Sequence, residues 1–110
     1  MKVIQLSEQN SIVNRFLMEL RDRYIQSDSM RFRRNIERIG EVMAYEISRT
    51  LDYKSIEIET PLAKTIVSVP ADKVVIGTIL RAAMPLHDGI FHYFDGAESA
   101  FISAYRQYRD

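Results

Sequence analysis

The first half of the sequence spaces its hydrophobic residues as a pair of helices does. Apolar side chains recur every three or four residues, which is the period of one helix face. They are Ile12, Val13, Phe16, Leu17, Leu20 and Tyr24, and then Phe32, Ile36, Ile39, Met43 and Ile47. The pattern predicts one helix from a cap at Asn10 or Ser11 to about Ile25, and a second helix over Met30–Leu51.

The middle of the sequence changes to a period of two. In SIEIET, Ile56 and Ile58 alternate with polar residues, and Pro61 ends the run. KTIVSV follows and ends at Pro70. Short alternating runs bounded by proline are typical of strands, so residues 53–72 are predicted to form a β-hairpin.

The remaining residues read as strand, helix and strand. KVVIGTIL, Lys73–Leu80, is almost continuously apolar, which is typical of a parallel strand buried on both faces. Met84–Phe94 reads as a helix with Pro85 in its first turn, and Ser99–Tyr105 reads as a second strand. The order predicts a right-handed βαβ unit whose two strands are parallel. The expected fold class is therefore α/β, with an N-terminal helical pair.

Composition narrows the class of protein. The 110 residues suit one domain, with a helical region over 1–52, the hairpin over 53–72 and the βαβ unit over 73–110. Fifteen basic and fifteen acidic residues balance, which argues against a nucleic-acid partner. The sequence has no cysteine and hence neither disulfides nor a thiolate metal site. No apolar run approaches the roughly 20 residues that span a bilayer, and the N-terminus does not resemble a signal peptide. We therefore expect a cytoplasmic protein.

Two arginines follow the two strands of the βαβ unit. Arg81 comes directly after the first strand and Arg106 directly after the second. Ligands of parallel sheets bind beyond the carboxyl ends of the strands, and the N-terminus of the intervening helix favours an anion. These features predict a phosphate or diphosphate site. The alternative is that both arginines are solvated loop residues, and Arg109 is a weaker candidate than either.

Other charged residues have simpler interpretations. Four arginines cluster at the start of the second helix: Arg31, Arg33, Arg34 and Arg38. The favoured interpretation is a solvated or subunit-contact face. Because cations are disfavoured at a helix N-terminus, an acidic partner is expected nearby. A nucleic-acid or effector-phosphate site is the alternative. His87 and His92 are five residues apart and do not share a helix face as a metal-binding pair would. No metal site is expected among the side chains.

The segment around Arg81 resembles a known family. TILRAAMPLHDG, residues 78–89, is similar to the P-I-L-R-A-G-L-G-M-M-D-G segment of uracil phosphoribosyltransferases. The family pattern continues to a Tyr-Arg pair, matched by Tyr105 and Arg106. Upstream, RFRRNIERIGEVMAYEIS resembles the family's R-F-R … G-x-L-x-Y-E-A helix. The matching positions there are Arg31, Phe32, Arg33, Gly40, Tyr45 and Glu46. The resemblance extends from about residue 30 to 106.

The resemblance implies part of a type I phosphoribosyltransferase-like parallel sheet and an enzyme of pyrimidine salvage. The family converts uracil and phosphoribosyl diphosphate to UMP and diphosphate, with Mg²⁺ as cofactor. By resemblance, Arg81 and Arg106 bind phosphoribosyl diphosphate. Leu80, Ala82 and Ala83 form the diphosphate loop, and Asp88 and Gly89 support it. No catalytic group is expected in this half of the enzyme. A homodimer is the expected assembly.

The sequence departs from the family pattern in residues and in length. Thr78 replaces a proline, and Ala83 and Pro85 replace glycines. Family members are about twice as long, and their 5′-phosphate loop and uracil-recognition segment come after the Tyr-Arg pair. We therefore expect an N-terminal half that is inactive alone. The alternatives are a non-catalytic nucleotide-sensing or dimerisation module, or an RNA-binding regulator on the same fold.

Overall fold

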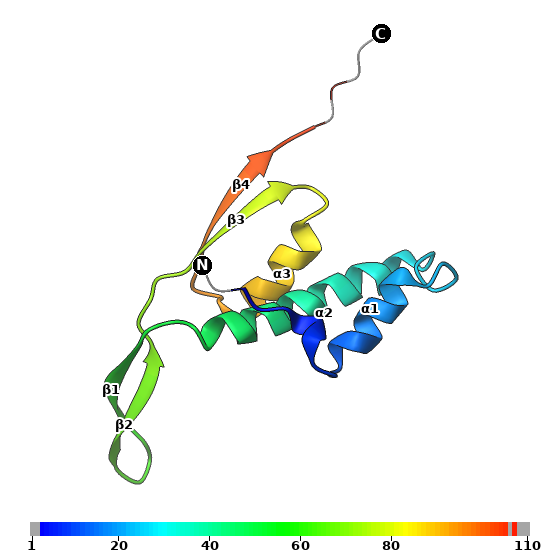
Figure 1. Ribbon diagram of the computed structural model, residues 1–110. Coiled ribbons are helices and arrows are strands. Elements are labelled where there is room, and N and C mark those ends of the chain that lie inside the picture. Colours follow the sequence, from blue (N-terminus) through cyan, green and yellow to red (C-terminus); the bar gives the residue numbers. More distant parts are fainter. Residues whose placement is uncertain (1–2, 106, 108–110) are drawn as a thin grey trace.

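The computed structural model describes residues 3–105 and residue 107. It has a mixed α/β fold with two separate two-stranded sheets (Figure 1). In chain order the elements are a 3₁₀ turn η1 (Leu6–Glu8), α1 (Val13–Arg21), α2 (Ser29–Ser48), β1 (Tyr53–Glu59), β2 (Lys64–Pro70), β3 (Val75–Leu80), α3 (Met84–Tyr93) and β4 (Glu98–Ser103). None of the helices within the described residues is long and apolar enough to cross a membrane.

The helical pair is present, but α1 is shorter than the sequence predicts. It ends at Arg21 rather than near Ile25. The Asp22 carboxylate accepts hydrogen bonds from the backbone N–H groups of Tyr24, at 2.8 Å, and Ile25, at 3.4 Å. Such local side-chain bonds compete with helical ones. As a result Tyr24, which the pattern assigns to the apolar face, is 75% exposed.

The long helix α2 begins at a side-chain cap and then crosses α3 at very short range. The Asp28 carboxylate accepts the backbone N–H of Arg31 at 3.1 Å, which satisfies one free donor of the first turn. Farther along, a Cβ atom added to Gly40 would lie 2.6 Å from the carbonyl oxygen of Leu86. A Cβ added to Gly89 would overlap the carbonyl of Glu37. The two glycines therefore allow the helix backbones to touch.

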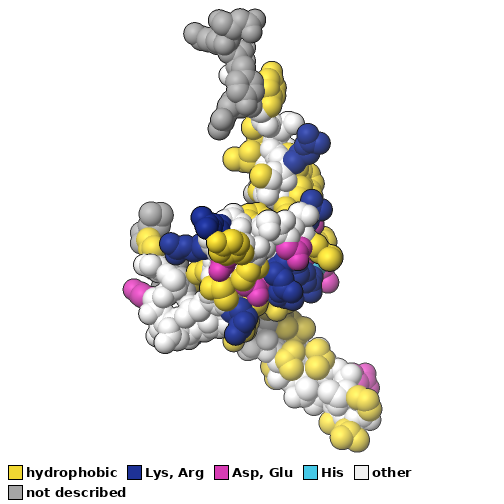
Figure 2. All heavy atoms as spheres, turned by 90° about the vertical axis from the view of Figure 1, so that its right-hand side faces the viewer, with side chains coloured by type: hydrophobic (Ala, Val, Ile, Leu, Met, Phe, Trp, Pro, Cys, Tyr) yellow, Lys and Arg dark blue, Asp and Glu magenta, His cyan; other side chains and the backbone are white. Residues whose placement is uncertain are grey.

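The predicted hairpin is confirmed and projects away from the helices. β1 and β2 pair antiparallel from Tyr53 opposite Pro70 to Glu59 opposite Lys64. Figure 1 shows the pair extending from the body, and Figure 2 shows hydrophobic side chains on this projection. Ile66 is 69% exposed. The hairpin is stabilised by its own pairing rather than by the core.

The βαβ unit is also confirmed, with one correction. β3 and β4 are parallel and adjacent, from Val75 opposite Glu98 to Leu80 opposite Ser103. The side chains of Ile76 and Thr78 are buried against α3. On the other face Val75, Ile79 and Ile102 are more than half exposed. The prediction that β3 is buried on both faces is therefore wrong for this chain, because α3 covers only one face of the two strands.

Candidate anion site at the end of β3

The candidate site lies where β3 ends and α3 begins. Arg81 and Ala82 follow the strand, and Ala83 is the N-cap of α3 with helical backbone angles. The Leu80–Arg81 peptide bond is cis. The loop is closed by a hydrogen bond of 3.0 Å from the backbone N–H of Met84 to the carbonyl of Arg81. No side chain caps α3, and of its first turn the Met84 N–H is bonded to Arg81 and Pro85 has none, so the backbone donor left for a ligand is the N–H of Leu86.

Two of the sequence departures fit this loop without strain. Ala83 has φ −83° and ψ −2°, a conformation open to any residue, so the glycine of the family pattern is not required there. Pro85 lies in the first turn of α3, where the missing N–H would have no helical partner in any case. Thr78 is 4% exposed and faces α3.

A groove of about 880 Å³ opens beside this loop. One wall comes from the start of α2 and the other from the loop and the first turns of α3. Its lining residues are Met30, Phe32, Arg33, Arg34, Ile36 and Glu37 on the first wall, and Leu80, Arg81, Ala82, Met84, Pro85 and Asp88 on the second. The groove therefore combines an apolar floor with three arginines and two carboxylates.

The charges in the groove leave a positive excess. Glu37 forms an ion pair with Arg34 at 3.3 Å. The Asp88 carboxylate lies 3.1 Å from Nδ1 of His87. Within the part of the chain that the structure describes, Arg33 and Arg81 have no ion-pair or hydrogen-bond partner for their guanidinium groups. Unpaired cations beside an uncapped helix start favour an anionic ligand.

The structure brings most of the predicted site residues together. Leu80, Arg81, Ala82 and Asp88 line the groove, and Ala83 caps α3. Gly89 is buried at the crossing with α2 and is thereby a packing residue of the site. The second predicted arginine, Arg106, lies outside the described residues, so its place beside Arg81 stays a prediction. The pairing of Leu80 with Ser103 does bring the ends of both strands to one edge.

The arginine cluster of α2 divides into two groups, and sequence reasoning missed one of them. Arg33 and Arg34 line the groove. The sequence favours a solvated or subunit-contact face for them, although Arg33 is among the positions that match the family's R-F-R motif. That match was the feature of the sequence that could have identified Arg33 as a residue of the site. The fold of α2 across α3, which places this helix start beside the Arg81 loop, could not be read from local periodicity.

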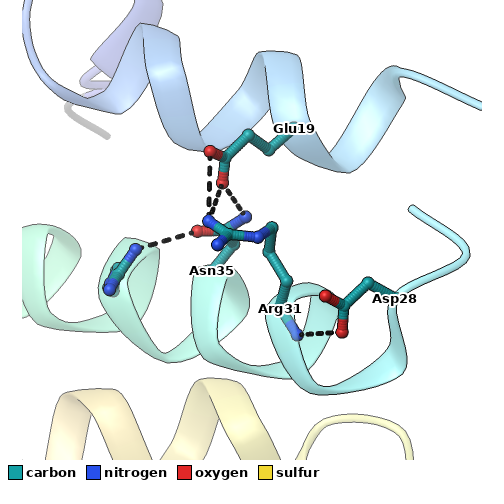
Figure 3. Close-up of polar contacts among 5 residues, drawn as sticks. Glu19, Asp28, Arg31 and Asn35 are labelled. Atoms are coloured by element: carbon teal, nitrogen blue, oxygen red, sulfur yellow. Dashed lines mark hydrogen bonds and ion pairs between the residues drawn. The ribbon is translucent and has the colours of Figure 1, made fainter. Parts of the chain in front are cut away.

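The other group, Arg31 and Arg38, belongs to the contact between α1 and α2. Figure 3 shows the Glu19 side chain of α1 directed at Arg31 and Asn35 of α2. Glu19 accepts a 2.7 Å hydrogen bond from Asn35 and lies 3.4 Å from Arg31. Arg38 donates to the Asn35 side-chain oxygen at 3.4 Å and lies over the Phe16 ring. The acidic partner expected near this cluster is therefore confirmed.

This network lowers the pKa of Glu19. The hydrogen bond from Asn35 is the largest cause, and the Arg31 guanidinium adds to it by a hydrogen bond and by its charge. Both interactions stabilise the carboxylate over the protonated acid. Asn35 itself has no exposed surface.

The two histidines serve separate contacts. His87 lies between Asp88 and Ser99, while His92 is 2.7 Å from Glu41. Across the described ranges, 3–105 and 107, no group of three or more His, Cys, Asp or Glu side chains could hold a metal ion. The two carboxylates of the groove are both already engaged.

Comparison with known proteins decides the family. The model of the family "Uracil phosphoribosyltransferase" matches residues 7–110. The chain belongs to the uracil phosphoribosyltransferase family. A curated uracil phosphoribosyltransferase from Porphyromonas gingivalis is 56% identical over 110 residues, which is all of this chain and 51% of that protein. One from Thermococcus gammatolerans is 41% identical over 90% of this chain and 44% of its own length. The chain thus spans about half the length of the curated relatives it matches.

A solved structure supports the fold. The AQ2163 protein from Aquifex aeolicus superposes with a TM-score of 0.72 at 17% identity, over 89% of this chain and 46% of that one. At this level of identity the likeness concerns the fold alone. It confirms the α/β class predicted from the order of helices and strands, and it again covers about half of the larger protein.

Proposed function

We propose that this chain is the N-terminal half of a uracil phosphoribosyltransferase and that its groove binds the diphosphate group of phosphoribosyl diphosphate. The observation that carries the proposal is Arg81. It follows β3, lines the groove without an ionic partner among the described residues, and belongs to a chain 56% identical to a curated uracil phosphoribosyltransferase. The apolar lining beside it suits the less polar part of such a ligand.

The proposed chemistry is electrostatic. The bond between ribose C1 and the diphosphate oxygen breaks, a bond forms from C1 to a ring nitrogen of uracil, and that nitrogen loses its proton. Negative charge grows on the leaving diphosphate as its bond to carbon lengthens. Preorganised cations aimed at such charge stabilise the transition state. Arg81 would have this role, together with the Leu86 N–H in the first turn of α3 and, by family resemblance, Arg106.

We propose that Mg²⁺ would reach the groove already bound to the phosphates of the ligand. In phosphate-transferring sites this ion is bound by substrate phosphates, water and one or two carboxylates. Neither Glu37 nor Asp88 is free of another partner. The groove residues therefore do not fit a resident ion, and the steps assigned to them do not depend on it.

The proposal also covers assembly and location. The half-exposed apolar face of β3 and β4, with Val75, Ile79 and Ile102, favours contact with another protein surface. We propose a homodimer, which sedimentation of the full-length gene product would test. A cytoplasmic location, which cell fractionation would test, rests on the absence of cysteine. The comparisons give no support to the non-catalytic alternatives.

The test is an assay of UMP formation from uracil and phosphoribosyl diphosphate. The full-length gene product should be active, and Arg81→Ala should lower kcat/KM by roughly 100-fold or more. Arg49→Ala is a matched control, because Arg49 is an exposed arginine of a surface ion pair. It should leave kcat/KM unchanged. The isolated 110-residue chain should form no UMP. An inactive full-length protein, or an Arg81→Ala variant as active as the control, would overturn the proposal.

A further inference from the structure

His87 is a buried polar side chain with no part in the proposed chemistry. It is 8% exposed, and its ring lies 5.7 Å from that of Phe91, nearly parallel, and 5.2 Å from that of Phe101. Aromatic neighbours of this kind would accept a phenylalanine equally well. Burial of a polar ring is unfavourable unless the ring is hydrogen-bonded. Packing alone therefore does not explain why this position is histidine.

Both ring nitrogens of His87 have partners. Nδ1 is 3.1 Å from Oδ1 of Asp88, and Nε2 is 2.9 Å from the Ser99 hydroxyl oxygen. A carboxylate can only accept, so Nδ1 carries the hydrogen and donates it to Asp88. In the neutral ring Nε2 then accepts from the Ser99 hydroxyl. These contacts fix the ring and direct one N–H bond at the Asp88 carboxylate.

The position of Asp88 gives this bond a consequence. Its side chain is 49% exposed and lines the groove together with Arg81. A carboxylate facing a groove that binds diphosphate would repel the ligand. The N–H of His87 engages the carboxylate from its buried side, just as Arg34 engages Glu37, the other acid of the groove. Because both acids are held by these partners, they are kept from pairing with Arg33 and Arg81, which stay available to a ligand.

Ser99 in turn holds His87 from the neighbouring strand. Ser99 belongs to β4 and His87 to α3. Among the residues that the structure describes, theirs is the one side-chain hydrogen bond between these two elements. The imidazole is therefore bonded both to Asp88 of its own helix and to Ser99 of the sheet, and it cannot turn away from Asp88 without losing a hydrogen bond.

We propose that His87 is a positioning residue that holds the Asp88 carboxylate against α3 and so keeps it from pairing with the groove arginines that would bind a diphosphate group. The inference rests on the proposed function, because it assumes that diphosphate binds beside Arg81. It assigns to His87 and Ser99 a role in affinity that the family resemblance did not give them.

The test measures binding of Mg²⁺–diphosphate and of phosphoribosyl diphosphate to the full-length gene product by calorimetry. His87→Phe keeps the aromatic packing but frees the Asp88 carboxylate to pair with Arg33 or Arg81, and should weaken binding roughly 10-fold. The double variant His87→Phe/Asp88→Asn should restore affinity to within about twofold of wild type, because no freed carboxylate then competes with the ligand for the arginines. If His87 served folding alone, the double variant would bind no better than His87→Phe, because the second substitution would destabilise the protein further.

A matched control and a second measurement keep the outcomes distinct. His92→Gln breaks the other histidine–carboxylate contact of α3, away from the groove, and should leave affinity unchanged. If His87→Phe does not fold, nitrogen NMR of the wild-type imidazole decides instead. The Nδ1–H tautomer should persist and its shift should move when diphosphate is added, and an Nε2–H tautomer would contradict the inference.

The failures of the two proposals look different. If wild-type protein binds neither ligand, both the proposed function and the inference about His87 are contradicted. If wild type binds and His87→Phe binds equally well, or if the double variant is no better than His87→Phe, only the inference about His87 is overturned.

Discussion

The two sides of α2 are stabilised in opposite ways. Toward α1 the contact is polar, with Asn35 fully buried and bonded to Glu19. Toward α3 the contact is between backbones, which approach so closely at Gly40 and Gly89 that no side chain fits. The first contact depends on hydrogen bonds and ionisation. At these two glycines the second contact depends on shape, although His92 of α3 also lies 2.7 Å from Glu41 of α2.

This difference bears on the candidate site. The groove is formed between α2 and the loop that leads into α3, so its width is set by the backbone crossing. The polar contact with α1 lies on the other side of the helix and holds Arg31 and Arg38 away from the groove. The side of α2 that packs on α3 therefore positions the groove. The side that packs on α1 orients Arg31 and Arg38.

The largest expected effect comes from filling the backbone crossing. Gly89→Ala places a methyl group on the carbonyl of Glu37. Since backbone cannot move aside as a side chain does, we expect a loss of about 3 kcal/mol in the free energy of unfolding. Urea denaturation of the full-length protein would measure it, together with weaker diphosphate binding as the groove is pushed open.

Gly96→Ala provides the control for that substitution. A Cβ added there meets no atom within 4 Å. The stability should stay within about 0.5 kcal/mol of wild type, as for other surface substitutions. Equal losses at the two glycines would mean that the crossing is not as tight as the structure describes.

A smaller effect is expected at the polar contact. Asn35→Ala removes a fully buried amide and its bonds to Glu19 and Arg38. We expect a loss of about 2 kcal/mol in the free energy of unfolding, from the lost hydrogen bonds and the small cavity. Thermal or urea denaturation would measure it. Diphosphate affinity should be unaffected, in contrast to Gly89→Ala.

The exposed pair between Arg49 and Glu46 is the comparison for this variant. These side chains are 67% and 30% exposed. Glu46→Gln should change stability by less than about 0.5 kcal/mol, because exposed ion pairs contribute little. If Asn35→Ala lowered the free energy of unfolding no more than Glu46→Gln does, the polar network between α1 and α2 would not contribute to stability.

Local patterns predicted the βαβ unit and the hairpin well. Apolar runs ended by proline or followed by a helix leave few choices of strand, and adjacent parallel strands are the common outcome of such a unit. The place of Arg81 at the end of β3 follows from this order. Asp88 and Gly89 were assigned only as supporting residues by resemblance, and the structure gives each a physical contact.

Contacts between distant segments were not predictable from the same patterns. The crossing of α2 and α3 joins Gly40 to a helix whose position depends on the sheet, and the local periodicity near Arg33 does not indicate that it shares a groove with Arg81. The end of α1 was missed because the Asp22 side chain bonds to the backbone two and three residues ahead. Burial of β3 on both faces was expected from composition, which cannot say how many layers cover a strand.

The smallest effect should appear in the pH dependence of the α1–α2 contact. The pKa of Glu19 is lowered from 4.5 by the Asn35 hydrogen bond and by Arg31. A lowered pKa means that folding favours the ionised carboxylate. The contact therefore adds stability above about pH 4.5, the value for the unfolded chain, and loses it as the pH falls through the lower folded pKa.

Glu19→Gln should separate this contact from the backbone crossing. The stability difference between wild type and Glu19→Gln should be constant above about pH 5 and should shrink toward zero as the pH falls below the pKa of the unfolded chain. The difference between wild type and Gly89→Ala should not change over the same range, because no ionisable group takes part in that clash. Parallel urea titrations from pH 3 to pH 7 would measure both. If the Glu19→Gln difference stayed constant at low pH, ionisation of Glu19 would have no part in holding α1 against α2, and the two sides of α2 would be alike in depending on shape alone.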